Sequence, residues 1–167
     1  EVYSTAAKDE RIAVIGAGVC GLSAAFMLSQ RSYNVDIFEK TNEIGGSLKA
    51  HPDFDIFAND FSSKFKTTRV NFRLAENVTS LAGFTDYDAV ILATGRDTDI
   101  YGLASARNAE NYMTEIPGVF ACGEMCGTNV CDAMAEGLEV VNYVESYIIS
   151  GKPDFAKRVW KKEHCTR

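Results

Sequence analysis

The stretch that most constrains the fold is RIAVIGAGVCGLSAAFML, residues 11–28. The apolar run at Ile12–Ile15 is typical of a short buried strand, and the residues after the glycines are apolar on most sides of a helix, which predicts burial against a sheet. A second apolar run, YNVDIF at residues 33–38, predicts a strand parallel to the first. We therefore expect a βαβ unit within an α/β, Rossmann-like fold, with three layers and a central parallel sheet.

The turn between the first strand and the helix has the pattern GxGxxG, formed by Gly16, Gly18 and Gly21. The first glycine permits the tight turn, the second lets the main chain approach a pyrophosphate, and the third allows close packing of helix on sheet. The helix N-terminus adds free N–H groups and a positive dipole end for phosphates. Three glycines can also mark an ordinary turn, so the strand–turn–helix context carries the prediction of a dinucleotide site.

Two features after this unit narrow the ligand. Glu39 ends the second predicted strand, where its carboxylate can accept hydrogen bonds from ribose hydroxyls and would repel a 2′-phosphate, which disfavours NADP. The alternative is a solvent-exposed glutamate at a strand end. The pair Gly45-Gly46 predicts a second close approach of the main chain to the ligand, with a simple turn as the alternative.

Later segments predict further elements of the sheet and its helices. YDAVILATG, residues 87–95, is typical of a fully buried central strand, and IPGVFACGE, residues 116–124, predicts a strand that ends at an acidic turn. From about Asn129 to Ile149 the apolar residues follow helical spacing, with Thr128 or Asn129 as the N-cap and glycine and proline after the end. The acidic residues expected on the opposite, polar side of this helix are Asp132, Glu136, Glu139 and Glu145.

The remaining segments have weaker patterns. Residues 51–69 predict an irregular helix, VNFRL at residues 70–74 alternates like a strand, and NVTSL at residues 77–81 is another candidate strand. Residues 96–116 have little pattern. We expect an N-terminal extension at residues 1–10, one domain at residues 11–151, and a C-terminal tail at residues 152–167.

Taken together, GxGxxG, Glu39, the glycine pair, the ATG strand end and Gly123-Glu124 resemble the FAD-binding fingerprint of flavoproteins with two dinucleotide-binding domains. That group includes glutathione-reductase-like enzymes, thioredoxin reductases, the small subunit of glutamate synthase and the C-terminal half of dienoyl-CoA reductase. The resemblance covers residues 11–50 and 86–150 well. It implies FAD as cofactor, with Glu124 at its ribityl–pyrophosphate part and the last helix pointing its N-terminus at the flavin.

The resemblance also implies a set of cofactor-binding residues, without any identified catalytic residue or metal site. The set comprises Gly16, Gly18, Val19, Cys20, Gly21, Glu39, Lys40, Gly45, Gly46, Ser47, Leu48, Val78, Ala93, Thr94, Gly95, Gly123, Glu124, Asp132 and Ala133.

Family members place an NAD(P)H-binding domain between the ATG strand and the late acidic motif, which needs on the order of a hundred residues. Here only 27 residues, Arg96 to Cys122, lie between Gly95 and Gly123, and the sequence contains no second GxGxxG. We therefore expect an electron-transfer module or subunit of a larger oxidoreductase, with electrons exchanged with a partner chain or another domain. The start at Glu1 is consistent with a fragment or processed chain. The alternatives are a non-catalytic nucleotide-binding subunit and an NAD-dependent dehydrogenase built on one Rossmann unit.

The net charge and the cysteine content limit the classes of binding partner and the cellular compartment that we expect. A net charge of −6 disfavours nucleic acid and anionic membranes, and no apolar run reaches the roughly 18 residues of a membrane span. The five cysteines show no CxxC spacing, which indicates reduced thiols in the cytoplasm or an organelle matrix. Cys122 and Cys126 are a candidate redox pair near the expected flavin, although buried packing is favoured for them and for Cys20.

Overall fold

The computed structural model describes residues 8–96, 101–103 and 107–150 of the chain. The strands are β1 (Arg11–Ile15), β2 (Asn34–Glu39), β3 (Val70–Leu74), β4 (Ala89–Leu92) and β5 (Val119–Ala121). The α-helices are α1 (Val19–Gln30), α2 (Phe54–Phe65) and α3 (Val130–Ile149). Short 3₁₀ turns are η1 (Gly46–Ala50), η2 (Leu81–Phe84) and η4 (Gly123–Cys126).

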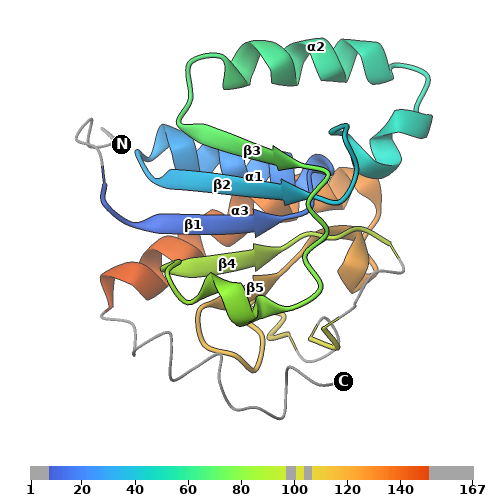
Figure 1. The fold of residues 1–167 in the computed structure, drawn as a ribbon. Helices are drawn as coiled ribbons and strands as arrows, with labels where there is room; N and C mark the ends of the chain where they lie inside the picture. Colours follow the sequence, from blue (N-terminus) through green and yellow to red (C-terminus); the bar gives the residue numbers. More distant parts are fainter. Residues whose placement is uncertain (1–7, 97–100, 104–106, 151–167) are drawn as a thin grey trace.

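The five strands form one parallel sheet in the order β3-β2-β1-β4-β5 (Figure 1). The central strand β1 pairs on both sides, so that Ala13 stands opposite Asp36 on β2 and Val90 on β4. This order places the carboxyl ends of β1, β2 and β4 side by side, where ligands bind in open parallel sheets. The predicted α/β Rossmann-like fold is confirmed.

The two faces of the sheet are covered differently. One face packs on α1 and α3, which lie together behind the sheet in Figure 1, and its core includes Val14, Leu22 and Val141. The other face is covered in the described residues by η2 and irregular chain, with Leu81 and Leu103 packed over it. Helix α2 lies beyond the β3 edge (Figure 1). The third layer is therefore made mostly of irregular chain.

Most predicted elements are present, with shorter bounds. The irregular helix expected over residues 51–69 is the regular helix α2, and the strand expected over residues 70–74 is β3. The candidate strand at residues 77–81 is wrong, because residues 77–80 have no strand pairing and Leu81 begins η2. Asn129 is the N-cap of α3, where its side chain accepts a hydrogen bond from the Asp132 N–H at 2.9 Å. The boundary expected at residue 151 lies outside the described residues.

Candidate functional site

The glycine turn joins β1 to α1. At two of its three glycines the main chain of a neighbouring segment lies so close that a side chain would not fit. Gly16 has φ +108°, and a Cβ placed on it would lie 2.1 Å from the Ala93 carbonyl oxygen. A Cβ on Gly21 would lie 2.0 Å from the Gly16 carbonyl oxygen. Gly18 differs, because no atom of the described chain outside Gly18 and its two neighbours in sequence lies within 4 Å of its Cβ position. The turn thus presents open space above Gly18 at the N-terminus of α1.

The glycine pair packs its main chain against this turn. The Gly45 N–H donates to the Ala17 carbonyl oxygen at 2.8 Å, and Gly18 and Gly45 form an isolated parallel bridge. Gly45 and Gly46 have φ +115° and +53°, and a Cβ on Gly46 would lie 3.0 Å from the Gly18 Cα. The sequence predicted a close approach of the glycine pair to the ligand. In the structure, the glycine pair approaches the main chain of the glycine turn.

Glu39 supports the glycine turn from the end of β2. Its Oε2 accepts a hydrogen bond from the Ala17 N–H at 2.9 Å, and its Oε1 accepts from the Thr41 N–H at 2.9 Å and the Thr41 hydroxyl at 3.0 Å. The residue is only 8% exposed, so the alternative of a solvent-exposed glutamate is wrong. A carboxylate has about four acceptor sites. Glu39 therefore retains acceptor capacity for a ligand while it holds the turn.

Glu124 connects three segments that are far apart in the sequence. It is 9% exposed, and its carboxylate accepts a short hydrogen bond from the Ser47 hydroxyl, next to the glycine pair. The Arg96 guanidinium, directly after the ATG sequence, contacts the other carboxylate oxygen at 3.2 Å. The late acidic motif therefore lies against both the glycine pair and the end of β4.

These segments enclose a cleft of about 330 Å³. Most of the predicted binding residues line it, namely Gly16, Gly18, Val19, Cys20, Glu39, Lys40, Gly46, Ser47, Ala93, Thr94, Gly95, Glu124 and Ala133. Val78 lines an adjoining cavity of about 70 Å³ that shares Gly16, Glu39, Lys40 and Thr94 with the cleft. A more open depression of about 600 Å³, lined partly by Arg11, Arg73 and Tyr87, shares no residue with the cleft. The cleft, at the glycine turn, is therefore the candidate site.

The other predicted residues lie outside both cavities. Gly21, Gly45 and Gly123 shape the turns around the cleft, and Leu48 is buried in the core at 4% exposure. Asp132 is exposed in the first turn of α3, where its carboxylate accepts a hydrogen bond from the Asn129 amide at 2.6 Å.

Three residues that line the cleft were missed by the sequence analysis: Thr41, Lys49 and Arg96. Arg96 and Lys49 each follow a recognised glycine motif within a few residues, and this proximity was the available signal. Together with Lys40 they gather positive charge around one cleft of a chain whose net charge is −6. Such a cluster suits a phosphate-bearing ligand.

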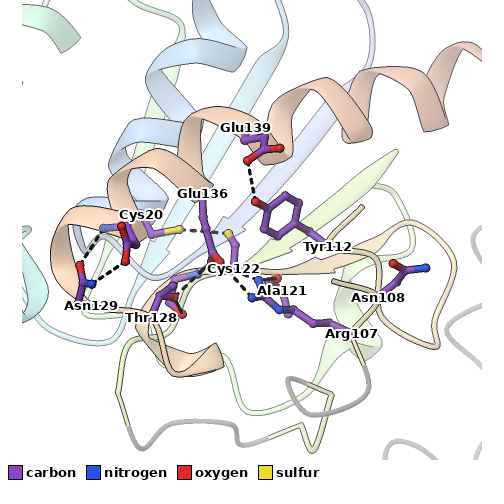
Figure 2. A network of polar contacts seen from close by, with 12 residues as sticks. Cys20, Arg107, Asn108, Tyr112, Ala121, Cys122, Thr128, Asn129, Glu136 and Glu139 are labelled. Carbon is purple, nitrogen blue, oxygen red and sulfur yellow. Dashed lines mark hydrogen bonds and ion pairs between the residues drawn. The ribbon is translucent and has the colours of Figure 1, made fainter. Parts of the chain in front are cut away.

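The turn at Gly123 is fixed by a network of side chains, which Figure 2 shows. Glu136 on α3 accepts a hydrogen bond from the Gly123 N–H at 2.7 Å and pairs with Arg107 at 3.0 Å. Thr128 donates to the Gly123 carbonyl oxygen at 2.5 Å. The Glu136 side chain is 13% exposed, so its expected place on the polar side of α3 is wrong. Burial disfavours the charge of Arg107, but hydrogen bonds to Glu136 raise its pKa overall.

The cysteine arrangement differs from the candidate redox pair. Cys122 is fully buried and faces Cys20 on α1, with the two sulfur atoms 3.1 Å apart (Figure 2). Cys126 is half-buried and Cys131 is exposed. The contact with Cys20, together with burial, raises the pKa of the Cys122 thiol well above its ordinary value. The thiol neighbour of Cys122 is therefore Cys20, which precedes it by 102 positions.

Comparison with known proteins agrees with this geometry. Residues 14–73 match the family model of the NAD(P)-binding Rossmann-like domain. The chain is 35% identical to the NADP(+)-dependent formate dehydrogenase subunit beta of Moorella thermoacetica, over 71% of the chain and 18% of that relative. It is 26% identical to the dihydrolipoyl dehydrogenase of Buchnera aphidicola, over 87% of the chain and 35% of that relative.

The fold is shared with THI4 of Thermovibrio ammonificans, at 16% identity and a TM-score of 0.55, over 84% of this chain and 89% of that one. The chain therefore has a Rossmann-like α/β fold, and its residues 14–73 are similar to the NAD(P)-binding Rossmann-like domain. It is related to dehydrogenases and spans 18% and 35% of the lengths of the two curated relatives.

Two negative findings apply to the described residues only. None of their helices is both long and apolar enough to cross a membrane. In the same ranges, no group of three or more histidine, cysteine, aspartate or glutamate side chains is arranged to hold a metal ion.

Proposed function

We propose that this domain binds FAD and serves as an electron-transfer module of a larger oxidoreductase. The observation that carries the proposal is the position of Glu124, buried at the same cleft as the glycine turn and hydrogen-bonded to Ser47 beside the glycine pair. A glycine turn with a carboxylate at Glu39 suits NAD and FAD alike. A second acidic residue across the cleft is what the FAD-binding fingerprint adds.

The cleft has the features that an extended dinucleotide requires. The open space above Gly18 is a cradle that a larger side chain would fill, and it lies at the N-terminus of α1, where phosphates bind. Glu39 would hold the adenosine ribose, and Glu124 would lie toward the ribityl part. Lys40, Lys49 and Arg96 supply positive charge around the same cleft. When bound, FAD would supply one- or two-electron transfer.

The electron partner is proposed to lie on another chain or domain. The segment from Arg96 to Cys122 has 27 residues, too few for the second dinucleotide domain that needs on the order of a hundred. The two dehydrogenase relatives are several times longer than the match. The name of one of them includes NADP(+), whereas Glu39 would repel a 2′-phosphate at this site.

Ligand titration tests the proposal. We expect the purified chain to bind FAD, with the visible absorption bands and quenched fluorescence of a bound flavin, and to bind NAD and NADP(+) more weakly. Gly18→Val should abolish binding because the side chain fills the open space above the turn. Gly83→Val is the matched control, since its Cβ position is equally open and Gly83 lies in η2, outside the cleft. Tight NAD binding without flavin affinity would overturn the assignment.

A structural, non-catalytic role is the second candidate, favoured by the engagement of the carboxylates at the cleft. Glu39 binds the Ala17 and Thr41 N–H groups, and Glu124 binds Ser47 and Arg96. Photoreduction of the FAD complex followed by stopped-flow mixing with a soluble quinone separates the two roles. Reoxidation within seconds supports electron transfer, whereas a flavin that stays reduced supports the structural role.

A further inference from the structure

Cys20 and Cys122 form a contact that the proposed function does not use. Cys20 is the second residue of α1 and lines the cleft, whereas Cys122 directly follows β5 and is 0% exposed. Their sulfur atoms are 3.1 Å apart, within hydrogen-bonding distance of two thiols. A sulfur–sulfur bond is about 2.05 Å long, so a closure of about 1 Å would bring the pair to bonding distance.

The main chain around Cys20 is packed so tightly that the contact has little freedom to open. A Cβ on Gly123, which has φ +82°, would lie 2.8 Å from the Cys20 Cβ and 3.0 Å from its sulfur. A Cβ on Gly137 of α3 would lie 2.3 Å from the Cys20 carbonyl oxygen. Two glycines therefore bring the η4 turn and α3 directly onto this cysteine, and the thiols meet because of this packing.

We propose that Cys20 and Cys122 are a redox modification site that closes to a reversible disulfide, with hydrogen peroxide as the oxidant. Cys20 reacts first because it lines the cleft and is 5% exposed, whereas Cys122 is 0% exposed and does not line it. Its sulfur attacks one peroxide oxygen, the O–O bond breaks, one water leaves, and a sulfenic acid forms. The Cys122 sulfur then attacks the Cys20 sulfur and displaces the second water. The two thiols lose two electrons and two protons in total, and the peroxide becomes two waters.

The surroundings of Cys122 set the pH dependence of the second step. Cys20 on α1 and Glu136 on α3 face it and disfavour its thiolate, whereas Arg107 favours it, and the result is a raised pKa. Because the thiolate is the attacking form, the disulfide forms faster as the pH rises above neutrality.

The modification would respond to occupancy of the cleft, and this part rests on the proposed function. A dinucleotide over the N-terminus of α1 would cover the approach to Cys20. Bound FAD should therefore slow peroxide oxidation of the pair. Formation of the disulfide in the ligand-free chain does not require FAD. Failure of the FAD-binding proposal can therefore be distinguished from failure of the disulfide proposal.

Differential alkylation with mass spectrometry of the full chain tests the pair directly. The ligand-free protein is treated with hydrogen peroxide, alkylated under denaturing conditions, reduced, and alkylated with a heavy reagent. We expect the heavy label on Cys20 and Cys122, a linked peptide lighter by two hydrogens, and loss of that link after reduction. Cys131→Ser should leave the yield unchanged, whereas Cys122→Ser should leave Cys20 as a sulfenic acid that a dimedone probe captures.

Two outcomes would overturn the proposal. In one, Cys20 and Cys122 both carry the light label after peroxide treatment while Cys131 is oxidised. In the other, Cys122 links to Cys126 and not to Cys20. Both are read on the wild-type chain, so the test holds even where a serine variant fails to fold.

Discussion

The two turns that border the cleft are built in opposite ways. The first, residues 16–21, requires positions without a side chain. A Cβ added to Gly16 or to Gly21 would lie 2.1 or 2.0 Å from a carbonyl oxygen, which is too close for any side chain. The second, Gly123–Cys126, is fixed by the presence of side chains, since Glu136 binds the Gly123 N–H and Thr128 binds its carbonyl oxygen. The first turn therefore depends chiefly on its glycines, with support from Glu39 at the Ala17 N–H, whereas the second depends chiefly on side chains that follow it in the sequence.

The largest effect is expected from a methyl group in the first turn. Gly16→Ala combines a Cβ 2.1 Å from the Ala93 carbonyl oxygen with φ +108°, and we expect a loss of about 3 kcal/mol or more in the free energy of unfolding. Urea unfolding followed by circular dichroism measures this loss. Gly18→Ala is the matched control, with an open Cβ position and φ −78°, and should cost under about 1 kcal/mol. Equal losses in the two variants would contradict the comparison.

The second turn should be destabilised by substitution of Glu136, a side chain on α3. Glu136→Ala leaves the Gly123 N–H and the Arg107 guanidinium without this acceptor, which we expect to cost about 2 kcal/mol. Glu136→Gln keeps an acceptor but loses the charge, so about half of that loss should return. The exposed Glu139, which accepts a hydrogen bond from the Tyr112 hydroxyl at 2.8 Å, supplies the control. Chemical denaturation of all three variants is the measurement, and a Glu139→Gln loss as large as that of Glu136→Ala would refute the assigned role.

The same contrast explains how far sequence could predict this molecule. The βαβ opening, the buried strand β4 and the long helix α3 were predictable because apolar periodicity and glycine spacing are local signals. Glu39 was predicted as a ligand residue from its place at the end of the second strand and Glu124 from the resemblance to the FAD-binding fingerprint, and both line the cleft. The sequence did not reveal the partly buried Glu136–Arg107 pair, because Arg107 lies in a weakly patterned segment that only tertiary packing brings to α3. The Cys20–Cys122 contact was hidden for the same reason, since 102 positions separate the pair.

A third prediction concerns the α1–α3 packing at the helix ends far from both turns, where Arg31 caps the C-terminus of α1. Glu145 on α3 contacts Lys8 and Arg31, each at 2.8 Å. Burial opposes its ionisation, but hydrogen bonding and the charges of Lys8 and Arg31 lower its pKa below the ordinary 4.5. The stabilisation is therefore present above about pH 4.5 and is lost as the pH falls through the lowered value.

Unfolding measured from pH 7 down to pH 3 checks this dependence. Glu145→Gln should remove about 1 kcal/mol at neutral pH and less at acid pH, because the protonated wild-type side chain has also lost its ion pairs. Lys64, whose exposed pair with Asp60 lies on α2, supplies the control, and Lys64→Gln should change little at any pH. A Glu145→Gln loss that stays constant with pH would contradict the assignment.

The smallest effect is expected at the hydroxyl of Ser47, which joins the second turn to the glycine pair that packs on the first turn. This group donates to the Glu124 carboxylate, while Arg96 contacts the other oxygen of the same carboxylate. Ser47→Ala removes one hydrogen bond and leaves the Arg96 contact, so we expect a loss of about 0.5–1 kcal/mol. A double-mutant cycle with Glu124→Gln isolates the link, because a direct contact gives a coupling energy of at least about 0.5 kcal/mol. Additive losses would mean that each turn is held only by its own contacts, and that Ser47 and Glu124 meet without stabilising the cleft.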